Sequence, residues 1–198
     1  MLSSNIAKYL SILISIIFHP LIISIYTFYF LIYYNAYKTE NANQIFIICL
    51  LFSTIIPIIT VLFLKYKNII TDLDASRKEQ RILPLTLAVL YSTLGFISLK
   101  YIGANYLVKG LMFCYITNTI ITIIITKYWK ISIHAMGVTA PISVLYISGY
   151  HYILIMSIIT VLVGIARIIL NAHNLQQVLA GSMLGFILTY LQIYLFFI

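Results

Sequence analysis

The sequence predicts an all-α protein, a polytopic transmembrane helical bundle of about seven spans. Of the 198 residues, 63% are hydrophobic and 8% are charged, and the mean hydropathy is +1.07. A soluble domain of this composition would have too little polar surface to cover its exterior. Runs of about 20 apolar residues, enough to cross a hydrocarbon core of about 30 Å, recur along the chain. We therefore expect one integral membrane domain over residues 1–198, with no separate soluble part.

The first span is expected over residues 9–34, with a kink at Pro20 because proline interrupts the hydrogen-bond ladder of a helix. The apolar stretch runs past the length of a signal-peptide core, and no small-residue cleavage site follows it before Pro20. We therefore expect this segment to be retained as a span. The polar residues 35–43 follow as a loop, and the second span is expected over residues 44–64.

The longest polar stretch, residues 65–81, separates the second span from the third, and Pro84 marks the start of the third helix. Short polar or glycine-containing breaks separate the later spans, and lysines flank Trp129 as an interfacial belt. These later spans are expected at residues 85–102, 106–126, 132–150, 152–168 and 176–197.

Seven spans would bring three polar clusters to one side of the membrane: Lys65–Arg81, Lys127–His134 and Arg167–His173. Nine lysines and arginines fall on that side and three on the other, so the positive-inside rule would place the clusters in the cytoplasm. Five of the nine are candidate ligands, however. Without them the count is four against three, and the orientation stays open.

The most informative pattern begins at Arg167 and continues with His173, Gln177, Gly181 and Gly185. The last four recur at intervals of four residues, which places them on one face of a helix. A stripe of small residues that lets another helix approach would explain the two glycines. It would not explain an arginine and a histidine at a membrane edge, which are costly unless they bind an anion or do chemistry.

A second histidine, His134, lies at the start of the fifth span, on the same predicted side as His173. Two imidazoles among fixed cations suit phosphoryl transfer: one attacks phosphorus, the other protonates the leaving oxygen, and arginines neutralise the phosphate oxygens. In the polar stretch before the third span, Arg77 and Arg81 are preferred as phosphate ligands because their guanidinium groups bind phosphate bidentately.

Other polar residues receive weaker assignments. His19, within the first span, is a functional candidate by position, but hydrogen bonding between helices is the favoured role. His151 falls on the opposite side and is expected to be structural. Cys49 and Cys114 lie in apolar spans and suit packing. No histidine or cysteine spacing resembles a zinc site, so neither a metal nor a cofactor is expected.

These residues resemble the motifs of the type 2 phosphatidic acid phosphatase superfamily, which shares its site with vanadium haloperoxidases. The family pattern S-R-x5-H-x3-D-V-x2-G-x3-G aligns without gaps on residues 166–185. The P-S-G-H pattern aligns on residues 131–134, and K-x6-R-P aligns loosely around Arg81. The resemblance covers about residues 70–190 and implies a six-helix core.

The resemblance also implies residue roles. His173 would be the nucleophile that forms a phosphohistidine, His134 the general acid, and Gln177 the residue that holds the His173 tautomer. The phosphate cradle would contain Arg77, Arg81, Lys130, Ser132 and Arg167.

Three positions depart from the family pattern. Asp74 stands where the pattern has lysine, so Arg77 or Lys78 would supply that cation. Ile133 replaces a glycine, and Gln177 replaces an aspartate, so a negative charge is lost beside the nucleophile.

The expected function is therefore hydrolysis of a lipid phosphate or diphosphate, such as a phosphatidate, a phosphatidylglycerol phosphate or a polyprenyl diphosphate. The expected partners are this substrate and membrane lipids, with no nucleic acid, because the net charge of +8 is concentrated beside the spans. The expected location is a bacterial inner membrane. Two alternatives stay open: a non-catalytic protein that binds or moves an anionic lipid or solute, and a lipid phosphotransferase.

Overall fold

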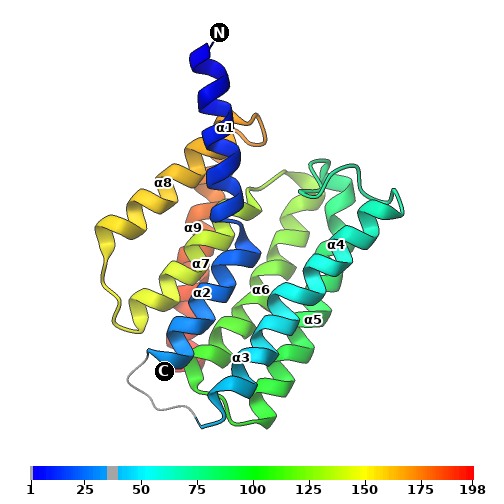
Figure 1. The fold of residues 1–198 in the computed structure, drawn as a ribbon. Coiled ribbons are helices and arrows are strands. Elements are labelled where there is room, and N and C mark those ends of the chain that lie inside the picture. The colour runs from blue at the N-terminus through cyan, green and yellow to red at the C-terminus, as the bar shows by residue number, and fades with distance from the viewer. Residues whose placement is uncertain (1, 35–39) are drawn as a thin grey trace.

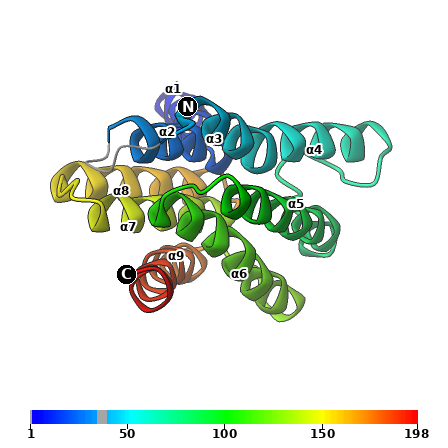
Figure 2. The same cartoon turned by 90° about the horizontal axis from the view of Figure 1, so that it is seen from below.

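A computed structural model describes residues 2–34 and 40–198, which contain helices and no strand. Figure 1 shows the helices in order, and Figure 2 shows the same bundle from below. The helices are α1 (Leu2–Ile17), α2 (Pro20–Tyr33), α3 (Ala42–Leu50), α4 (Ile56–Tyr66), α5 (Ile82–Tyr101), α6 (Tyr106–Tyr128), α7 (Ile133–Ile147), α8 (Ile153–Ile169) and α9 (Leu175–Phe196). A π-helical turn, Leu51–Ile55, joins α3 to α4, and a 3-10 turn, Lys78–Arg81, precedes α5.

The all-helical class is confirmed for the described residues, and the second and later predicted spans coincide with helix to within a few residues. The first, predicted over residues 9–34, begins earlier, at Leu2, and is divided into α1 and α2. Among the described residues, four helical segments are long and apolar enough to cross a membrane: α3 with α4, α5, α6 and α9. The number rises to five if α1 and α2 count as one bent span. Helices α7 and α8 are shorter, with 15 and 17 residues. Fifteen residues extend about 22 Å, less than a hydrocarbon core of about 30 Å. The long apolar helices are compatible with an integral membrane protein, while seven spans stay a prediction.

Helix α7 is the central helix of the bundle. It packs against α2 on one side and most extensively against α9 on the other (Figure 2). Most of its side chains are buried, which explains why its sequence is apolar and small without a polar face. The N-terminus of this central helix therefore presents His134 inside the molecule and away from the lipid-facing surface.

Two glycines of α9 make its contact with α7 possible. A Cβ atom at Gly181 would lie 2.5 Å from the backbone oxygen of Ser132, and one at Gly185 would lie 2.6 Å from that of Met136. Backbone atoms cannot rotate away as the end of a side chain can, so only glycine fits at these positions. The small-residue stripe is therefore a packing feature, and it holds the start of α9 against the start of α7.

The first span breaks where the sequence predicts a kink. Helices α1 and α2 are bent by 44° at the residues between Ile17 and Pro20. Proline has no N–H to continue the ladder but suits the first turn of a new helix, where that N–H needs no partner. After the break, α1 packs against α8 at the edge of the bundle (Figure 1).

The second span contains a local irregularity that sequence analysis did not predict. The π-helical turn Leu51–Ile55 lies just before Pro57, whose ring and missing N–H disrupt the regular helix. The turn is joined to α2 by hydroxyl groups, because Thr54 Oγ1 donates to Leu21 O at 3.1 Å and lies 3.0 Å from Ser24 Oγ.

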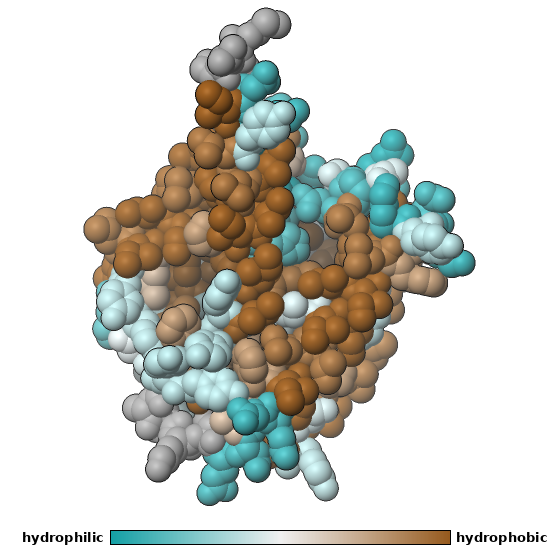
Figure 3. All heavy atoms as spheres, in the orientation of Figure 1, coloured by the Kyte–Doolittle hydropathy of each residue, from teal (hydrophilic) through white to brown (hydrophobic). Residues whose placement is uncertain are grey.

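The exposed surface is mainly hydrophobic over the middle of the molecule, with hydrophilic residues gathered toward two ends (Figure 3). One polar end lies over the loop between α4 and α5. The other lies at the opposite end of the molecule, near the start of α3. Part of the predicted loop at residues 35–43, including Lys38, lies outside the described residues. This distribution is that expected of helices surrounded by lipid along their length and by water at their ends.

Candidate functional site

Polar side chains from four separate segments converge at one end of the bundle, around a cavity of about 170 Å³. His134 and His173 line the same cavity, as the sequence predicts, together with Arg81. Asp74 and His19 line it as well. The remainder of the wall is mostly apolar and comes from α2, α4, α5 and the loop that precedes α5.

The end of α8 and the start of α9 position His173. Asn171 adopts a left-handed conformation with a φ of 52°, which Asn tolerates better than most residues and which ends helices. The chain then turns back, so that the backbone N–H of His173 donates to the carbonyl of Arg167 at 3.2 Å. The six-residue separation in the sequence thus becomes direct contact between the backbone groups of the two residues.

Gln177 orients the His173 ring through a capping box at the start of α9. Asn174 Oδ1 accepts the backbone N–H of Gln177 at 2.9 Å, and Gln177 Oε1 accepts that of Asn174 at 3.3 Å. Since a backbone N–H is a donor, the Gln177 atom that faces it is the carbonyl oxygen. That same oxygen lies 2.9 Å from His173 Nδ1. Nδ1 therefore carries the proton, and the Nε2 lone pair of His173 is left free.

The environment keeps His173 neutral near pH 7. Burial lowers its pKa to about 4, and the nearby cations Arg81, Lys130 and Arg167 act in the same direction, against the opposing effect of the Gln177 hydrogen bond. A neutral imidazole with a fixed Nδ1 proton has the protonation state required of a nitrogen nucleophile.

Arg81 is fixed by backbone carbonyls at the cavity wall. Its side chain is only 3% exposed. Nε donates to Ala75 O at 2.9 Å and one terminal nitrogen donates to Ile131 O at 3.0 Å. A guanidinium group has five N–H donors, so these two bonds leave three for a ligand. Arg81 thus joins the loop before α5 to the loop before α7.

Arg167 is buried beside the cavity and forms an ion pair. One terminal nitrogen donates to Asp74 Oδ2 at 2.8 Å, and its Nε is buried with no hydrogen-bond partner among the described residues. The Asp74 side chain is 34% exposed. Partial burial opposes ionisation of Asp74, but the neighbouring His134 and Arg167 outweigh it and hold its pKa below the ordinary value.

Lys130 and Ser132 are near the site but have structural partners. Lys130 Nζ donates to Ala172 O at 2.8 Å, which ties the loop before α7 to the loop that carries His173. Burial, with Arg81 and Arg167 nearby, lowers the pKa of Lys130. Ser132 is the N-cap of α7, and its Oγ accepts the backbone N–H of Ala135 at 3.3 Å. Neither side chain lines the cavity.

Arg77, predicted as a phosphate ligand, lies apart from the cavity. It is exposed at the start of the 3-10 turn, makes no side-chain cap and does not line the cavity. Lys78, the other cation considered for that role, reaches Lys127 O at 3.5 Å. The physical reason is that Arg81 at the end of this turn points inward to two carbonyls, whereas Arg77 lies four residues earlier, on the water-facing side.

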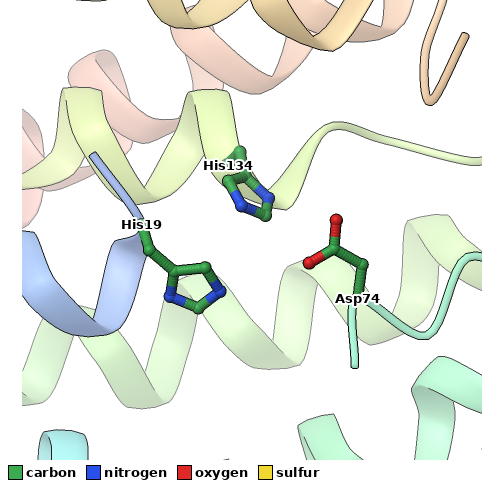
Figure 4. Close-up of side chains that lie close together, drawn as sticks. All are labelled: His19, Asp74 and His134. Carbon is green, nitrogen blue, oxygen red and sulfur yellow. The ribbon is translucent and has the colours of Figure 1, made fainter. Parts of the chain in front are cut away.

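Sequence analysis missed the roles of His19 and Asp74. The His19 ring lies edge to face against His134, with centroids 4.9 Å apart, and its Nδ1 caps α2 by accepting the backbone N–H of Leu21 at 3.3 Å. Figure 4 shows His19, His134 and Asp74 directed toward one another. These three residues are far apart in the sequence and share no local pattern. A signal was nevertheless present: His19 and Asp74 are polar residues beside apolar spans with no obvious partner.

His19, Asp74 and His134 are the described residues that could hold a metal ion, since their ligand atoms lie within 4.8 Å of one another. Asp74 is already paired with Arg167, and Arg81 and Lys130 add positive charge nearby. The arrangement suits an anion better than a cation.

Comparisons with protein-family models, with curated proteins and with solved structures found no match to this chain. The assignment of function therefore depends on the geometry and chemistry of the site.

Proposed function

We propose that this chain is an integral membrane lipid phosphatase that acts through a phosphohistidine. One observation carries the proposal: His134, His173 and Arg81, which come from three distant segments, line one cavity. Two imidazoles and a guanidinium group around a shared space supply a nucleophile, a proton donor and an anion ligand, the three elements that phosphoryl transfer requires.

In the proposed first step, Nε2 of His173 attacks phosphorus and the bond from phosphorus to the lipid oxygen breaks. Protonated His134 gives its proton to that leaving oxygen, so the lipid departs as an alcohol or as a lipid phosphate. In the second step, His134 accepts a proton from water while the water oxygen attacks phosphorus. The bond between phosphorus and His173 Nε2 then breaks, and inorganic phosphate is released.

The proposed phosphate pocket is positive for three reasons. Arg81 has three N–H donors that its backbone partners do not use. Arg167 has a buried Nε without a partner among the described residues, so it can donate one more hydrogen bond. The N-terminus of α7 lies at the cavity beside His134, and helix N-termini favour anions. Together these groups would neutralise the charge that develops on the phosphate oxygens.

The apolar part of the cavity would receive the beginning of the lipid chain. Its walls include Pro57, Leu85 and Ala88, and these residues also line a second cavity of about 200 Å³ deeper between the helices. A phosphate bound at the imidazoles would therefore have an apolar path beside it. This arrangement favours an amphipathic substrate, such as a phosphatidate, a phosphatidylglycerol phosphate or a polyprenyl diphosphate.

In this proposal seven helical segments cross the membrane, with α1 and α2 counted as one span and α3 and α4 as another. The protein lies in a bacterial inner membrane. The three polar clusters then face one aqueous side. The positive-inside rule favours the cytoplasmic side only if the cations of the site are counted.

The experiment is phosphate release by purified protein in detergent from a panel of lipid phosphates and diphosphates. Wild type is compared with His173→Ala and with His151→Ala, a histidine at the other end of the bundle beside Tyr146. Release by wild type and by His151→Ala, with loss in His173→Ala, supports the proposal. No release by wild type from any member of the panel would defeat it.

A second candidate is a non-catalytic protein that binds an anionic lipid or solute. Gln177 favours it, because a neutral amide gives His173 less support as a developing cation than a carboxylate would. Binding of a lipid phosphate that His173→Ala does not weaken, without turnover, would support this alternative. A phosphotransferase would release phosphate only when an acceptor alcohol is absent.

A further inference from the structure

His19 belongs to the same cavity as the two histidines of the proposed reaction, although it lies in the first span. Its ring is perpendicular to that of His134, with the ring centroids 4.9 Å apart. Figure 4 shows the ring at the break between α1 and α2, directed toward Asp74 and His134.

A backbone hydrogen bond fixes the tautomer of His19. Its Nδ1 accepts the N–H of Leu21 at 3.3 Å, as the N-cap of α2. In a neutral imidazole with Nδ1 as acceptor, the proton is on Nε2. The second ring nitrogen lies on the side of Asp74 (Figure 4). His19 therefore presents an N–H donor to the cavity, whereas the orientation of His173 leaves a lone pair facing it.

The approach of His19 to His134 is set by helix packing. Gly137 lies one turn after His134 on the same face of α7, and a Cβ atom there would lie 2.6 Å from Cβ of Pro20. The missing side chain lets the first turn of α2 contact α7. His19, the residue just before Pro20, is consequently held against His134 by a rigid contact between two helices.

The charges around His19 select its ligand. Arg81 lines the cavity together with a single carboxylate, Asp74. Asp74 is already bonded to Arg167, a buried cation behind it that does not itself line the cavity. A donor N–H directed into such a positive site suits the oxygen of an anion. On this basis, and on the function proposed above, we propose that His19 is a phosphate-binding residue whose Nε2–H donates to an oxygen of the bound phosphate group.

The test measures binding of orthovanadate, a phosphate analogue, to the full-length protein in detergent, so it does not depend on turnover. His19→Asn and His19→Ser are the informative variants, because both residues are good N-caps and keep the start of α2. His151→Asn is the matched control at the other end of the bundle. Each protein is also examined by thermal unfolding, and for turnover of any lipid phosphate that the wild type hydrolyses.

We expect the two capping variants to unfold near the wild-type temperature and to bind vanadate about tenfold more weakly, the usual loss for one hydrogen bond to a charged group. His151→Asn should bind like wild type. Equal vanadate affinity in wild type and both His19 variants would overturn the inference. Failure of both capping variants to fold would also overturn it, since His19 would then serve only the bend.

The outcome separates this inference from the proposed function. Weaker vanadate binding in the variants without lipid hydrolysis by wild type would keep the inference and defeat the phosphatase. Hydrolysis by wild type with unchanged KM and vanadate affinity in the variants would do the reverse. A third outcome would overturn the inference in favour of a metal site. In that case Zn²⁺ would raise the unfolding temperature of wild type but not that of His19→Asn, and neither protein would bind vanadate.

Discussion

Arg167 and Asp74 form an ion pair of 2.8 Å in which the guanidinium group is buried and the carboxylate is 34% exposed. The carboxylate thus occupies a donor that a phosphate oxygen would also use. An incoming phosphate would compete with Asp74 for Arg167, and the more exposed partner is the one that can move into water.

Asp74→Asn should therefore weaken the fold and strengthen anion binding. Without the carboxylate, the charge of Arg167 is left buried and uncompensated, and we expect a loss of about 1–3 kcal/mol in the free energy of unfolding. Vanadate should then raise the unfolding temperature of the variant more than that of wild type. Glu79→Gln, a change in the exposed 3-10 turn, is the control. If vanadate stabilised Asp74→Asn and wild type equally, competition between Asp74 and phosphate would be contradicted.

Gln177→Glu should increase the rate of lipid phosphate hydrolysis. Glutamate preserves the capping box and the contact with His173 Nδ1, and it adds a negative charge that favours the developing imidazolium. Gln177→Met has a side chain of similar length but cannot accept the hydrogen bond from His173 Nδ1–H. Loss of the fixed tautomer should lower kcat by about 100-fold or more. Equal kcat values for Met, Gln and Glu at this position would show that the hydrogen bond does not serve the reaction.

His173 should make stability depend on pH between its two pKa values. Its pKa is lowered to about 4 in the folded protein, mainly by burial, from an ordinary value of 6.5. As the pH falls from 6.5 toward 4, the unfolded chain takes up a proton that the folded protein does not, so the free energy of unfolding decreases. Unfolding temperatures measured across this range should decline less in His173→Asn than in wild type. The same slope in both proteins would refute the lowered pKa.

The two arginines that the sequence treats alike should behave differently. Arg77→Ala should leave stability and lipid phosphate hydrolysis unchanged, since the side chain is exposed and away from the cavity. Arg81→Lys keeps a positive charge but cannot bond Ala75 O and Ile131 O together while facing the cavity. We expect KM to rise about tenfold for this variant. A rise in KM for Arg77→Ala would restore that residue to the cradle.

Gly181→Ala should destabilise the protein by about 1–3 kcal/mol through overpacking. The new methyl group would lie 2.5 Å from the backbone oxygen of Ser132, the N-cap of α7. Gly164→Ala is the matched control, because its methyl would meet only a side-chain carbon of Val178, at 2.9 Å. Unfolding temperatures of the two variants check the prediction, which requires the larger decrease for Gly181→Ala.

Most of the fold could be predicted from the sequence because its signals are local. Each helix is indicated by a run of apolar residues of sufficient length, and its limits are indicated by a proline or a short polar break. Neither signal depends on the rest of the chain. The π-helical turn escaped prediction because Pro57 disturbs a helix that its flanking residues otherwise favour. The shortness of α7 also depends on its neighbours, since a helix covered by protein need not match the membrane thickness.

The candidate site was predictable where its residues share a local pattern and not where they meet only through packing. The spacing of His173 and Gln177 is one helical turn, so their contact could be inferred from the sequence. His19 and Asp74 reach the cavity through the bend at Pro20 and the loop before α5, whose paths depend on tertiary contacts. The position of Arg77 away from the cavity has the same cause, because the path of the 3-10 turn decides which arginine points inward.

The left-handed conformation of Asn171 fixes the path of the short segment, residues 168–172, that separates Arg167 from His173. On either side of it, the backbone carbonyl of Arg167 and the backbone N–H of His173 are hydrogen-bonded to each other. Inserting or deleting a single amino acid there would swing the imidazole away from its glutamine while leaving every membrane helix intact. The length of this short connection is therefore under tighter constraint than the composition of the helices it joins.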